Sequence, residues 1–395
     1  MSRQSGLSQG QSAPKFSLEL QGKAQLPTSI CLNMIVKNES HVIRRCLASV
    51  RSLITYWVIV DTGSTDGTQA VIQDFMKDIP GELHKGKWVD FAHNRNEALQ
   101  LAKGKADYTL FIDADQILQF DAEFEMPKLD KDYYSIREVD ADTSSLKIGL
   151  VKSCLDWKWE WVIHEALKVP KKRTSAILKG VILKSPHDGF RSQDPEKLKK
   201  DAETLEAALR NDPHNTRYQF YLALTYAQTK QYELALKCFE KRIEMRSWKE
   251  EVFWSMLNIG IIYEILHKPE EMVVSSYFNA YKYDPSRAEP LYHLAAYFYR
   301  THNYEGGYLF ASQGLLIPAP QDTIFIKQWI YDYGLRIELI NCAFKLGKYE
   351  EAQQACVEVL ANPNLPEHVR EELTQNQVLI QLKLLNVNTE RDRAF

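Results

Sequence analysis

The stretch Thr109–Gln116 reads TLFIDADQ, a short apolar run that stops at two carboxylates, Asp113 and Asp115. Such a run is typical of a parallel strand covered on both faces, and open α/β sheets bind ligands at the carboxyl ends of these strands. Carboxylate oxygens suit Mg²⁺ or Mn²⁺, and Mg²⁺ usually binds one or two of them together with water and substrate phosphate. The stretch therefore predicts an α/β domain that binds a metal ion and a diphosphate-bearing substrate.

The residues around this stretch support the same fold class. Strand-like and helix-like segments alternate from Thr28 to Asp113. In order they are SICLNMIV (29–36), 41–51, WVIVD (57–61), 68–76, HKGKWVDF (84–91), 93–102 and YTLFID (108–113). Because strands that alternate with helices form βαβ units, this pattern predicts a parallel sheet with helical connections.

Composition narrows the class of protein and its location. The chain has 395 residues, 45% hydrophobic and 26% charged, which is typical of a globular protein with two or more domains. A net charge of -3 gives no signature for binding nucleic acid. The sequence contains no apolar stretch of about 18 residues, so no transmembrane helix is predicted. The polar start MSRQSGLSQGQSAPK argues against a secretory signal. Six cysteines without a C-x-x-C pair favour a reducing, cytoplasmic location.

An internal repeat begins after about Asp194. Asp212-Pro213 recurs 72 residues later as Asp284-Pro285. The same shift relates Leu222-Ala223 to Leu294-Ala295, Tyr226 to Phe298 and Tyr232 to Tyr304. The shift is close to twice the tetratricopeptide period of about 34 residues. NIGIIYEILHKPEE (258–271) supplies a middle unit, and AFKLGKYEEAQQA (343–355) supplies a later one after a longer insertion.

This period predicts stacked helix pairs, which form a solenoid with a concave binding face. The alternative is a plain helical bundle that supports the first domain. The predicted organisation is a disordered tail at 1–27, an α/β domain at 28–193, helical repeats at 194–385 and a C-terminal tail at 386–395. The apolar stripe of the last helices, EEAQQACVEVL (350–360) and HVREELTQNQVLIQLKLL (368–385), either joins two copies of the chain or closes the solenoid.

Four motifs carry a resemblance to a known family. They are NMIVKNES (33–40), WVIVDTGSTDGT (57–68), WVDFAHNRNEAL (88–99) and LFIDAD (110–115). In this order they resemble family 2 glycosyltransferases of the GT-A fold. With WEWVIHEAL (159–167), SPHDGF (185–190) and the repeats, the chain is similar to the subgroup that joins this domain to tetratricopeptide repeats, which includes bacteriocin S-glycosyltransferases. The resemblance covers roughly Pro27 to Leu360 and implies a nucleotide-diphospho-sugar transferase domain followed by an all-α repeat domain.

The resemblance also implies roles for residues of the donor site. Asp61 would hold the base or the ribose of the nucleotide. Arg95 would face the nucleotide, where a guanidinium suits bidentate contact with phosphate, and the alternative is a surface arginine of a helix. The segment Asp113-Ala114-Asp115 would bind the donor's diphosphate, with both carboxylates on the metal and Asp115 as the more direct ligand.

A second group of residues lies where relatives carry their catalytic acid. Trp157, Trp159 and Trp161 alternate, so on a strand they would share one face, either as a platform for a sugar or acceptor or as part of the core. The motif His164-Glu165 follows them, and related enzymes carry an acidic pair there. We expect Glu165 to be the general base that takes the acceptor's proton, with His164 as the alternative.

His187, in Pro186-His187-Asp188-Gly189, resembles the histidine that some GT-A enzymes use as a third metal ligand. Imidazole favours Mn²⁺ over Mg²⁺; the alternative for this histidine is a structural role.

The resemblance thus implies a metal-dependent, inverting transfer of a hexose from a nucleotide-diphosphate sugar to a protein, peptide or glycan. UDP is the default nucleotide, Mn²⁺ or Mg²⁺ the cofactor. A second hypothesis is a decayed repeat scaffold that binds a protein partner, although the presence of Asp61, Asp113, Asp115 and Glu165 argues against it. A nucleotidyltransferase or dehydrogenase is disfavoured because NMIVKN stands at the first strand in place of a glycine-rich loop.

Overall fold

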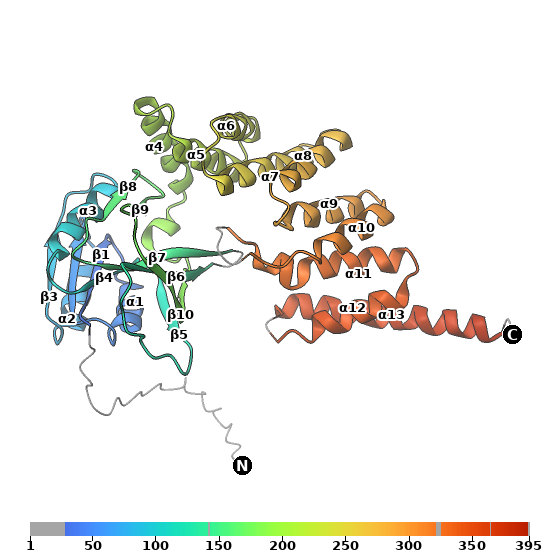
Figure 1. Cartoon of the computed structure of the whole chain (residues 1–395), viewed down its shortest axis with the longest axis horizontal. Coiled ribbons are helices and arrows are strands. Elements are labelled where there is room, and N and C mark those ends of the chain that lie inside the picture. Colours follow the sequence, from blue (N-terminus) through green and yellow to red (C-terminus); the bar gives the residue numbers. More distant parts are fainter. Residues whose placement is uncertain (1–27, 141–142, 321–324, 364, 394–395) are drawn as a thin grey trace, which may run out of the picture.

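The computed structural model describes residues 28–140, 143–320, 325–363 and 365–393, with side chains as far as 386. An α/β domain is followed by an arc of helices that rises from it and curves back toward the sheet (Figure 1). The tail expected at 1–27 lies outside the described residues. A mixed α/β domain followed by helical repeats is the predicted fold class, which is therefore confirmed.

The sheet of the α/β domain has eight strands in the order β3-β2-β1-β4-β7-β6-β10-β5. The first four are parallel, and β7 then pairs antiparallel with both β4 and β6. Their bounds are β1 Ile30–Val36, β2 Tyr56–Asp61, β3 Gly81–Lys85, β4 Tyr108–Phe111, β5 Ile117–Phe120, β6 Tyr133–Val139, β7 Ser144–Lys152 and β10 Ser175–Lys184. The chain order of the parallel part reverses between β1 and β4, and ligands bind at such a switch point.

Helices cover both faces of the parallel strands, as continuous apolar strands require. They are α1 Ile43–Val50, α2 Thr68–Met76 and α3 Phe91–Ala102. Leu32 and Met34 of β1 pack into the same buried cluster as Ile43 of α1, whereas Cys31 packs on the other face against Ala102 of α3. The alternation predicted from the sequence is confirmed, with one difference. The segment HKGKWVDF (84–91) is a strand only as far as Lys85, and Trp88 and Val89 are exposed in the loop that follows.

The helices after the sheet form antiparallel pairs. Their bounds are α4 Lys197–Asn211, α5 Thr216–Gln228, α6 Tyr232–Glu244, α7 Lys249–Ile265, α8 Glu270–Tyr283, α9 Glu289–Arg300, α10 Tyr304–Gly314, α11 Leu335–Lys345, α12 Tyr349–Leu360 and α13 Glu367–Arg393. The 72-residue repeat relates α5–α6 to α9–α10, and Leu222-Ala223 and Leu294-Ala295 are buried at equivalent positions. The insertion before α11 contains a short π-helix, η2, at Ile330–Gly334.

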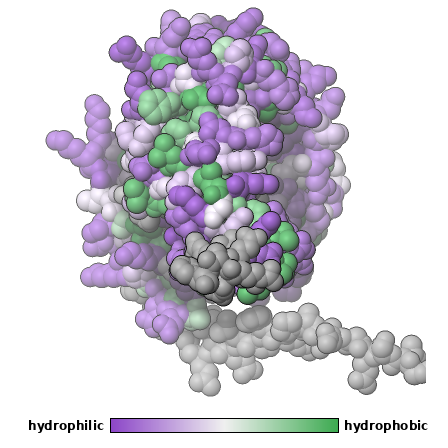
Figure 2. All heavy atoms as spheres, turned by 90° about the vertical axis from the view of Figure 1, so that its right-hand side faces the viewer, coloured by the Kyte–Doolittle hydropathy of each residue, from purple (hydrophilic) through white to green (hydrophobic). Residues whose placement is uncertain are grey.

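The end of the chain differs from the predicted organisation. Helix α13 continues through residue 385 to Arg393, so the backbone shows no break at the expected start of a C-terminal tail. On α13 the side chains of Val378, Leu379, Leu382 and Leu385 are exposed. Figure 2 views the molecule from this side, where hydrophobic residues are scattered among hydrophilic ones. An oligomer through these helices stays a prediction.

The arc of helices contacts the α/β domain in two places. Near its start, Tyr218 of α5 accepts a hydrogen bond from the backbone N–H of Val162, at 3.1 Å. Farther along, Ser144 at the start of β7 exchanges backbone hydrogen bonds with Ile326, at 3.0 and 3.2 Å. The space between the two contacts faces the carboxyl ends of β1 and β4, so residues from both domains surround the switch point.

Candidate functional site

A cavity of about 920 Å³ lies between the two domains. Its walls come from the ends of β1 and β4, from β7, from the segment after β10 and from α4, α5 and the start of α7. The predicted site residues that line it are Arg95, Asp113, Ala114, Asp115, Trp159, Glu165 and His187. The lining also includes the aromatic residues Tyr221, Trp248 and Phe325. A cavity of this size accommodates a ligand of several hundred daltons.

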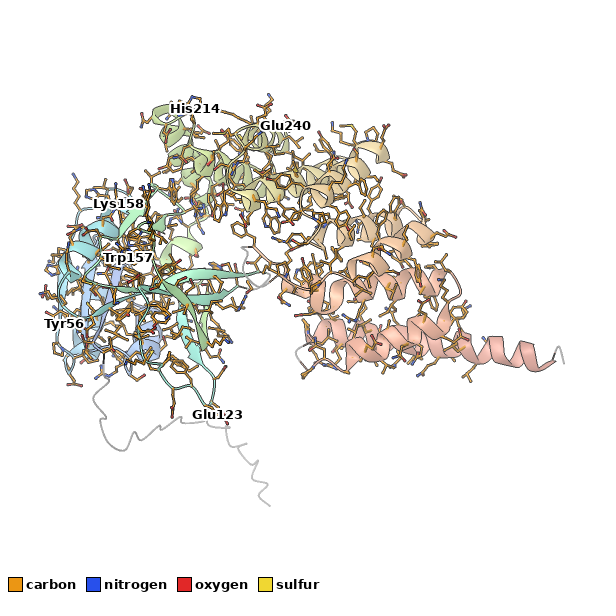
Figure 3. The ribbon with its side chains drawn as sticks, viewed as in Figure 1. Tyr56, Glu123, Trp157, Lys158, His214 and Glu240 are labelled. Carbon is orange, nitrogen blue, oxygen red and sulfur yellow. The ribbon has the colours of Figure 1, made fainter. Side chains whose placement is uncertain are left out.

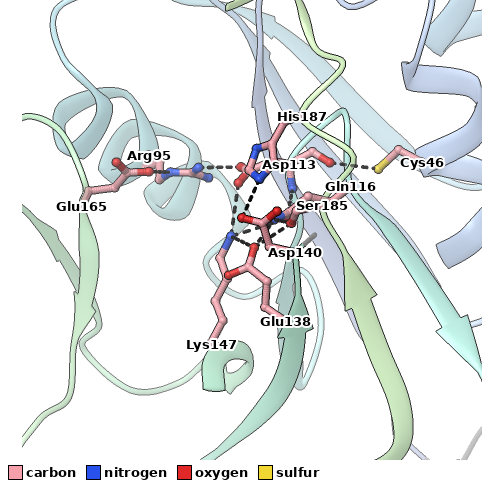
Figure 4. A network of polar contacts seen from close by, with 10 residues as sticks. All are labelled: Cys46, Arg95, Asp113, Gln116, Glu138, Asp140, Lys147, Glu165, Ser185 and His187. Carbon is pink, nitrogen blue, oxygen red and sulfur yellow. Dashed lines mark hydrogen bonds and ion pairs between the residues drawn. The ribbon is translucent and has the colours of Figure 1, made fainter. Parts of the chain in front are cut away.

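Asp113 is held by two cations rather than left open (Figure 4). Its Oδ1 accepts from Arg95 Nη2 at 2.5 Å, and its Oδ2 accepts from Lys147 Nζ at 3.2 Å. Although burial alone would raise the pKa of this carboxyl, the two cations hold it well below its usual value. The backbone of Asp113 is fixed as well, because its N–H donates to Gln116 and its carbonyl accepts from the Cys46 thiol. Asp113 is therefore ionised and rigid.

Arg95 bonds two acidic residues to which the sequence analysis gave different roles. Asp113 is expected at the donor's diphosphate, and Glu165 is expected to be the general base. Arg95 Nε donates to Glu165 Oε1 at 2.6 Å, while Nη2 bonds Asp113. The guanidinium lies 4.9 Å from the ring of Trp159 and is 9% exposed. Arg95 is thus no surface arginine. Its pair with Glu165 leaves Oε2 of that carboxylate without a hydrogen-bond partner among the residues that the structure describes.

Asp115 differs from Asp113 in having no ion pair with a described lysine or arginine. Burial first and Asp113 second raise the pKa of its carboxyl. The backbone of Gly189 packs against it so closely that a Cβ at that position would lie 2.9 Å from Asp115 Oδ2. Arg45 holds this arrangement, because it bonds both the Asp115 carbonyl and the carboxylate of Asp188.

The three predicted metal ligands fit a metal ion unequally. Asp113 has both oxygens on cations, and His187 Nε2 lies 3.0 Å from Asp140 Oδ2. No group of three or more histidine, cysteine or acidic side chains is arranged for a metal within the described ranges. Asp115 fits, because its carboxylate lacks a cation and Mg²⁺-type sites often use one carboxylate with water and phosphate. The residues present thus suit a cation that a substrate helps to bind.

Asp61 lies at the end of β2 but does not line the cavity. Its Oδ1 accepts from the backbone N–H groups of Gly63 and Ser64, both at 2.8 Å. Its Oδ2 is buried and has no hydrogen-bond partner in the described structure. An unpaired buried carboxylate oxygen is costly. The role of Asp61 in holding the nucleoside stays a prediction.

The three tryptophans do not form one platform. Trp157 and Trp159 are buried in a small core cluster with Phe111, and Trp159 meets Phe111 edge to face. Strand β8 covers only Lys158–Glu160, and the backbone turns at Trp161, which has a φ of 77°. Trp161 consequently packs beside helices α4 and α5. Figure 3 places Trp157 and Lys158 on this part of the α/β domain. Trp157 and Trp159 thus share a face as part of the core, whereas Trp161 departs from it because β8 ends at Glu160.

His164 lies beside Glu165 but points to the repeat domain. Its ring stacks on Tyr221 with 3.8 Å between ring centroids and 8° between ring planes. The crowded cleft, with Arg217 and other cations nearby, lowers the pKa of His164, so its ring is neutral. His164 and Glu165 both line the cavity, so the choice between them as the general base stays a prediction.

Sequence reasoning missed several polar residues of the cavity. Lys147 reaches Asp113 from the middle of β7, and Gln116 joins Asp113 to Glu138 through its amide. Glu39, from NMIVKNES, lines the cavity, and burial raises the pKa of its carboxyl to about 7. The signal for Gln116 was its place directly after the acidic pair. Lys147 carried no such signal, because only the register of β7 against β4 brings it to the site.

Comparison with known proteins agrees with this architecture. The sequence model of the family described as glycosyl transferase family 2 matches residues 31–129. The glycosyltransferase SunS of Bacillus subtilis is 26% identical over 215 residues, which are 50% of this chain and 49% of that protein. The poly-beta-1,6-N-acetyl-D-glucosamine synthase of Staphylococcus epidermidis is 32% identical over 28% of this chain and 27% of its own. The family resemblance recognised in the motifs is therefore confirmed for this domain.

Two further proteins are similar to parts of this chain. A TPR repeat-containing protein of Synechococcus elongatus is 37% identical over 101 residues, 26% of this chain and 23% of that protein. The crystal structure of MamA covers 43% of this chain and 92% of its own, with a TM-score of 0.35 and 12% identity. The chain spans about a quarter to about half the length of the curated relatives that it matches. Among the described residues, no helix is long and apolar enough to cross a membrane.

Proposed function

We propose that this protein is a glycosyltransferase that moves a hexose from a nucleotide-diphosphate sugar to an acceptor in the cavity between the two domains. The observation that carries the proposal is the Glu165–Arg95–Asp113 chain, which joins the predicted base to the predicted diphosphate site within a domain that matches family 2. Asp115 supplies the open carboxylate next to it. A UDP-hexose is the proposed donor because UDP is the common nucleotide of the resembling family.

The donor's diphosphate lies, on this proposal, at the ends of β1 and β4. Lys147 and Arg95 place two positive charges there, and Asp115 with Ala114 forms the edge that faces the cavity. Mn²⁺ or Mg²⁺ would be held by Asp115 and would stabilise negative charge on the diphosphate. The nucleoside extends toward Asp61, whose Oδ2 lacks a partner in the described residues.

The acceptor approaches from the repeat side of the cavity. Glu165 takes the proton of the attacking group through Oε2, while Arg95 keeps Oε1 in place. The acceptor atom then bonds to the anomeric carbon, and the bond to the nucleoside diphosphate breaks in the same displacement, which inverts the configuration. A protein, peptide or glycan acceptor fits because the repeat domain forms part of the wall and carries exposed aromatic surface there at Trp248.

The test is nucleotide release from a panel of UDP-, GDP- and dTDP-hexoses with Mn²⁺, Mg²⁺ or EDTA. We expect metal-dependent release from one donor, and a loss of about 10²–10⁴-fold in kcat for Glu165→Gln with unchanged donor affinity. Because an acceptor can be obligatory, donor binding is measured on the same panel. Absence of both release and binding would favour the alternative, a catalytically decayed repeat scaffold that binds a protein partner.

A further inference from the structure

The loop that carries Glu165 has a backbone that its own sequence does not favour. It runs from Trp161 to Glu165 between β8 and β9 (Ala166–Lys168), where Glu160 pairs with Ala166. Trp161 has a φ of 77° and His164 a φ of 53°, both in the left-handed region. A bulky residue such as Trp161 rarely adopts this region, whereas histidine adopts it more often, so we expect contacts from outside the loop to hold Trp161 in place.

Those contacts come mainly from helix α5 of the first repeat. Arg217 Nε donates to the backbone carbonyl of His164 at 3.0 Å, and its guanidinium lies 4.6 Å from the ring of Trp161. Tyr218 and Tyr221, one and four residues along the same helix, bond Val162 and stack on His164. Ile163 is buried in a cluster with residues of α4 and α5. Four consecutive loop residues thus rest on the repeat domain.

Arg217 is itself anchored from behind. Its Nη1 lies 3.4 Å from Glu251 Oε1, while Glu251 Oε2 accepts from Arg242 at 2.9 Å. Arg242 and Glu251 are almost fully buried. Tyr221 and Trp248 pack their rings against the Arg217 guanidinium. Because Glu251 keeps Arg242 as its partner, loss of Arg217 leaves no buried charge unpaired, and we expect the fold to tolerate that loss.

On the function proposed above, we infer that Arg217 is a positioning residue for the general base. It fixes the carbonyl of His164, which is one residue from Glu165, while Arg95 fixes the Glu165 carboxylate. The base therefore sits between an arginine of the α/β domain and an arginine of the first repeat. The repeat domain is part of the catalytic apparatus as well as a wall for the acceptor.

The experiment compares Arg217→Met, which keeps the aliphatic stem but removes every donor, with Arg217→Lys and a matched control. The control is Arg336→Met, because Arg336 lies on α11 and pairs with Glu358 at 3.7 Å, away from the cavity. Three quantities are measured on the full chain: kcat for nucleotide release from the UDP-hexose panel, the dissociation constant for the donor, and hydrogen exchange of the amides of residues 161–166.

We expect Arg217→Met to lower kcat by about 10–100-fold, the size of effect that a misplaced catalytic group produces. Donor affinity stays unchanged, and exchange rises in residues 161–166 but not in α9. Arg217→Lys regains part of kcat, because an ammonium can reach one of the hydrogen-bond partners of Arg217. Arg336→Met changes none of these.

Two results would overturn the inference. Unchanged exchange in residues 161–166 would show that Arg217 does not hold the loop, whatever the activity. Faster exchange with full kcat would show that the loop's position does not matter for catalysis. The proposed function fails separately, through absence of donor binding and release in the unaltered protein; that outcome removes the catalytic role of Arg217, whereas the exchange experiment still decides whether α5 holds the loop.

Discussion

Helices α5 and α9 are equivalent in the 72-residue repeat, yet their equivalent residues make different contacts. Arg217 of α5 corresponds to Glu289 of α9, and Tyr221 corresponds to His293. Arg217 and Tyr221 reach out to the loop that carries Glu165. Glu289 and His293 turn inward, to Arg287 and to the ring of Tyr277. Helix α5 thus contacts the loop that lines the cavity, whereas the equivalent residues of α9 pack within the repeat domain.

The largest expected difference between the two positions is in stability. Glu289 is fully buried and bonds Arg287 and the Tyr331 hydroxyl, so Glu289→Gln removes the buried negative charge that faces Arg287. Breaking a buried pair of this kind costs about 3–5 kcal/mol. Chemical denaturation should show a loss of that size for Glu289→Gln and a much smaller one for Arg217→Met. Equal losses would mean that both positions are structural.

Glu338 of α11 is an acid that, unlike Glu289, forms no ion pair among the described residues. Its Oε2 is buried without a hydrogen-bond partner in the described structure, and burial raises the pKa of its carboxyl to about 7. Between the pKa of about 4.3 in the unfolded state and the higher pKa in the folded state, the folded protein binds more protons than the unfolded one. The contribution of Glu338 to the free energy of unfolding therefore falls as pH rises through this range.

We therefore expect Glu338→Gln to stabilise the protein by about 1–3 kcal/mol at pH 8 and to have little effect at pH 4.5. Thermal or urea unfolding at the two pH values measures the difference. A variant that is destabilised equally at both would contradict the assignment of an unpaired carboxyl.

The smallest effect concerns the stacked pair of Tyr221 and His164. Aromatic pairs contribute about 0.5–1.5 kcal/mol beyond the area that they bury, so Tyr221→Leu should lower kcat by roughly threefold to tenfold without weakening the donor. Tyr221→Phe keeps the stack and should retain nearly all activity. His293→Leu, at the equivalent position of α9, is the control and should leave kcat unchanged in the folded protein. Equal kcat for the Leu and Phe variants of Tyr221 would exclude the stack from catalysis.

Local patterns were sufficient for the parts of the site that lie on single elements. The run TLFIDADQ predicted a strand that leads to Asp113, and β4 ends two residues before it, at Phe111; the 72-residue shift predicted equivalent helices. The sequence could not reveal that Lys147 meets Asp113, because the contact depends on the antiparallel register of β7 against β4. It also could not reveal the turn at Trp161, since packing against α5 overrides the local alternation of tryptophans.

The measurement that tests the central claim most directly is donor binding by titration calorimetry, with Mn²⁺ and with EDTA, for the unaltered protein and Asp115→Asn. Asp156→Asn is the control, because Asp156 is an exposed acid outside the cavity. We predict that a UDP-hexose binds the unaltered protein and the control in a metal-dependent way, and that Asp115→Asn loses about tenfold or more of that affinity. A donor affinity that changes neither on removal of the metal nor on the Asp115→Asn substitution would contradict the placement of the donor in this cavity.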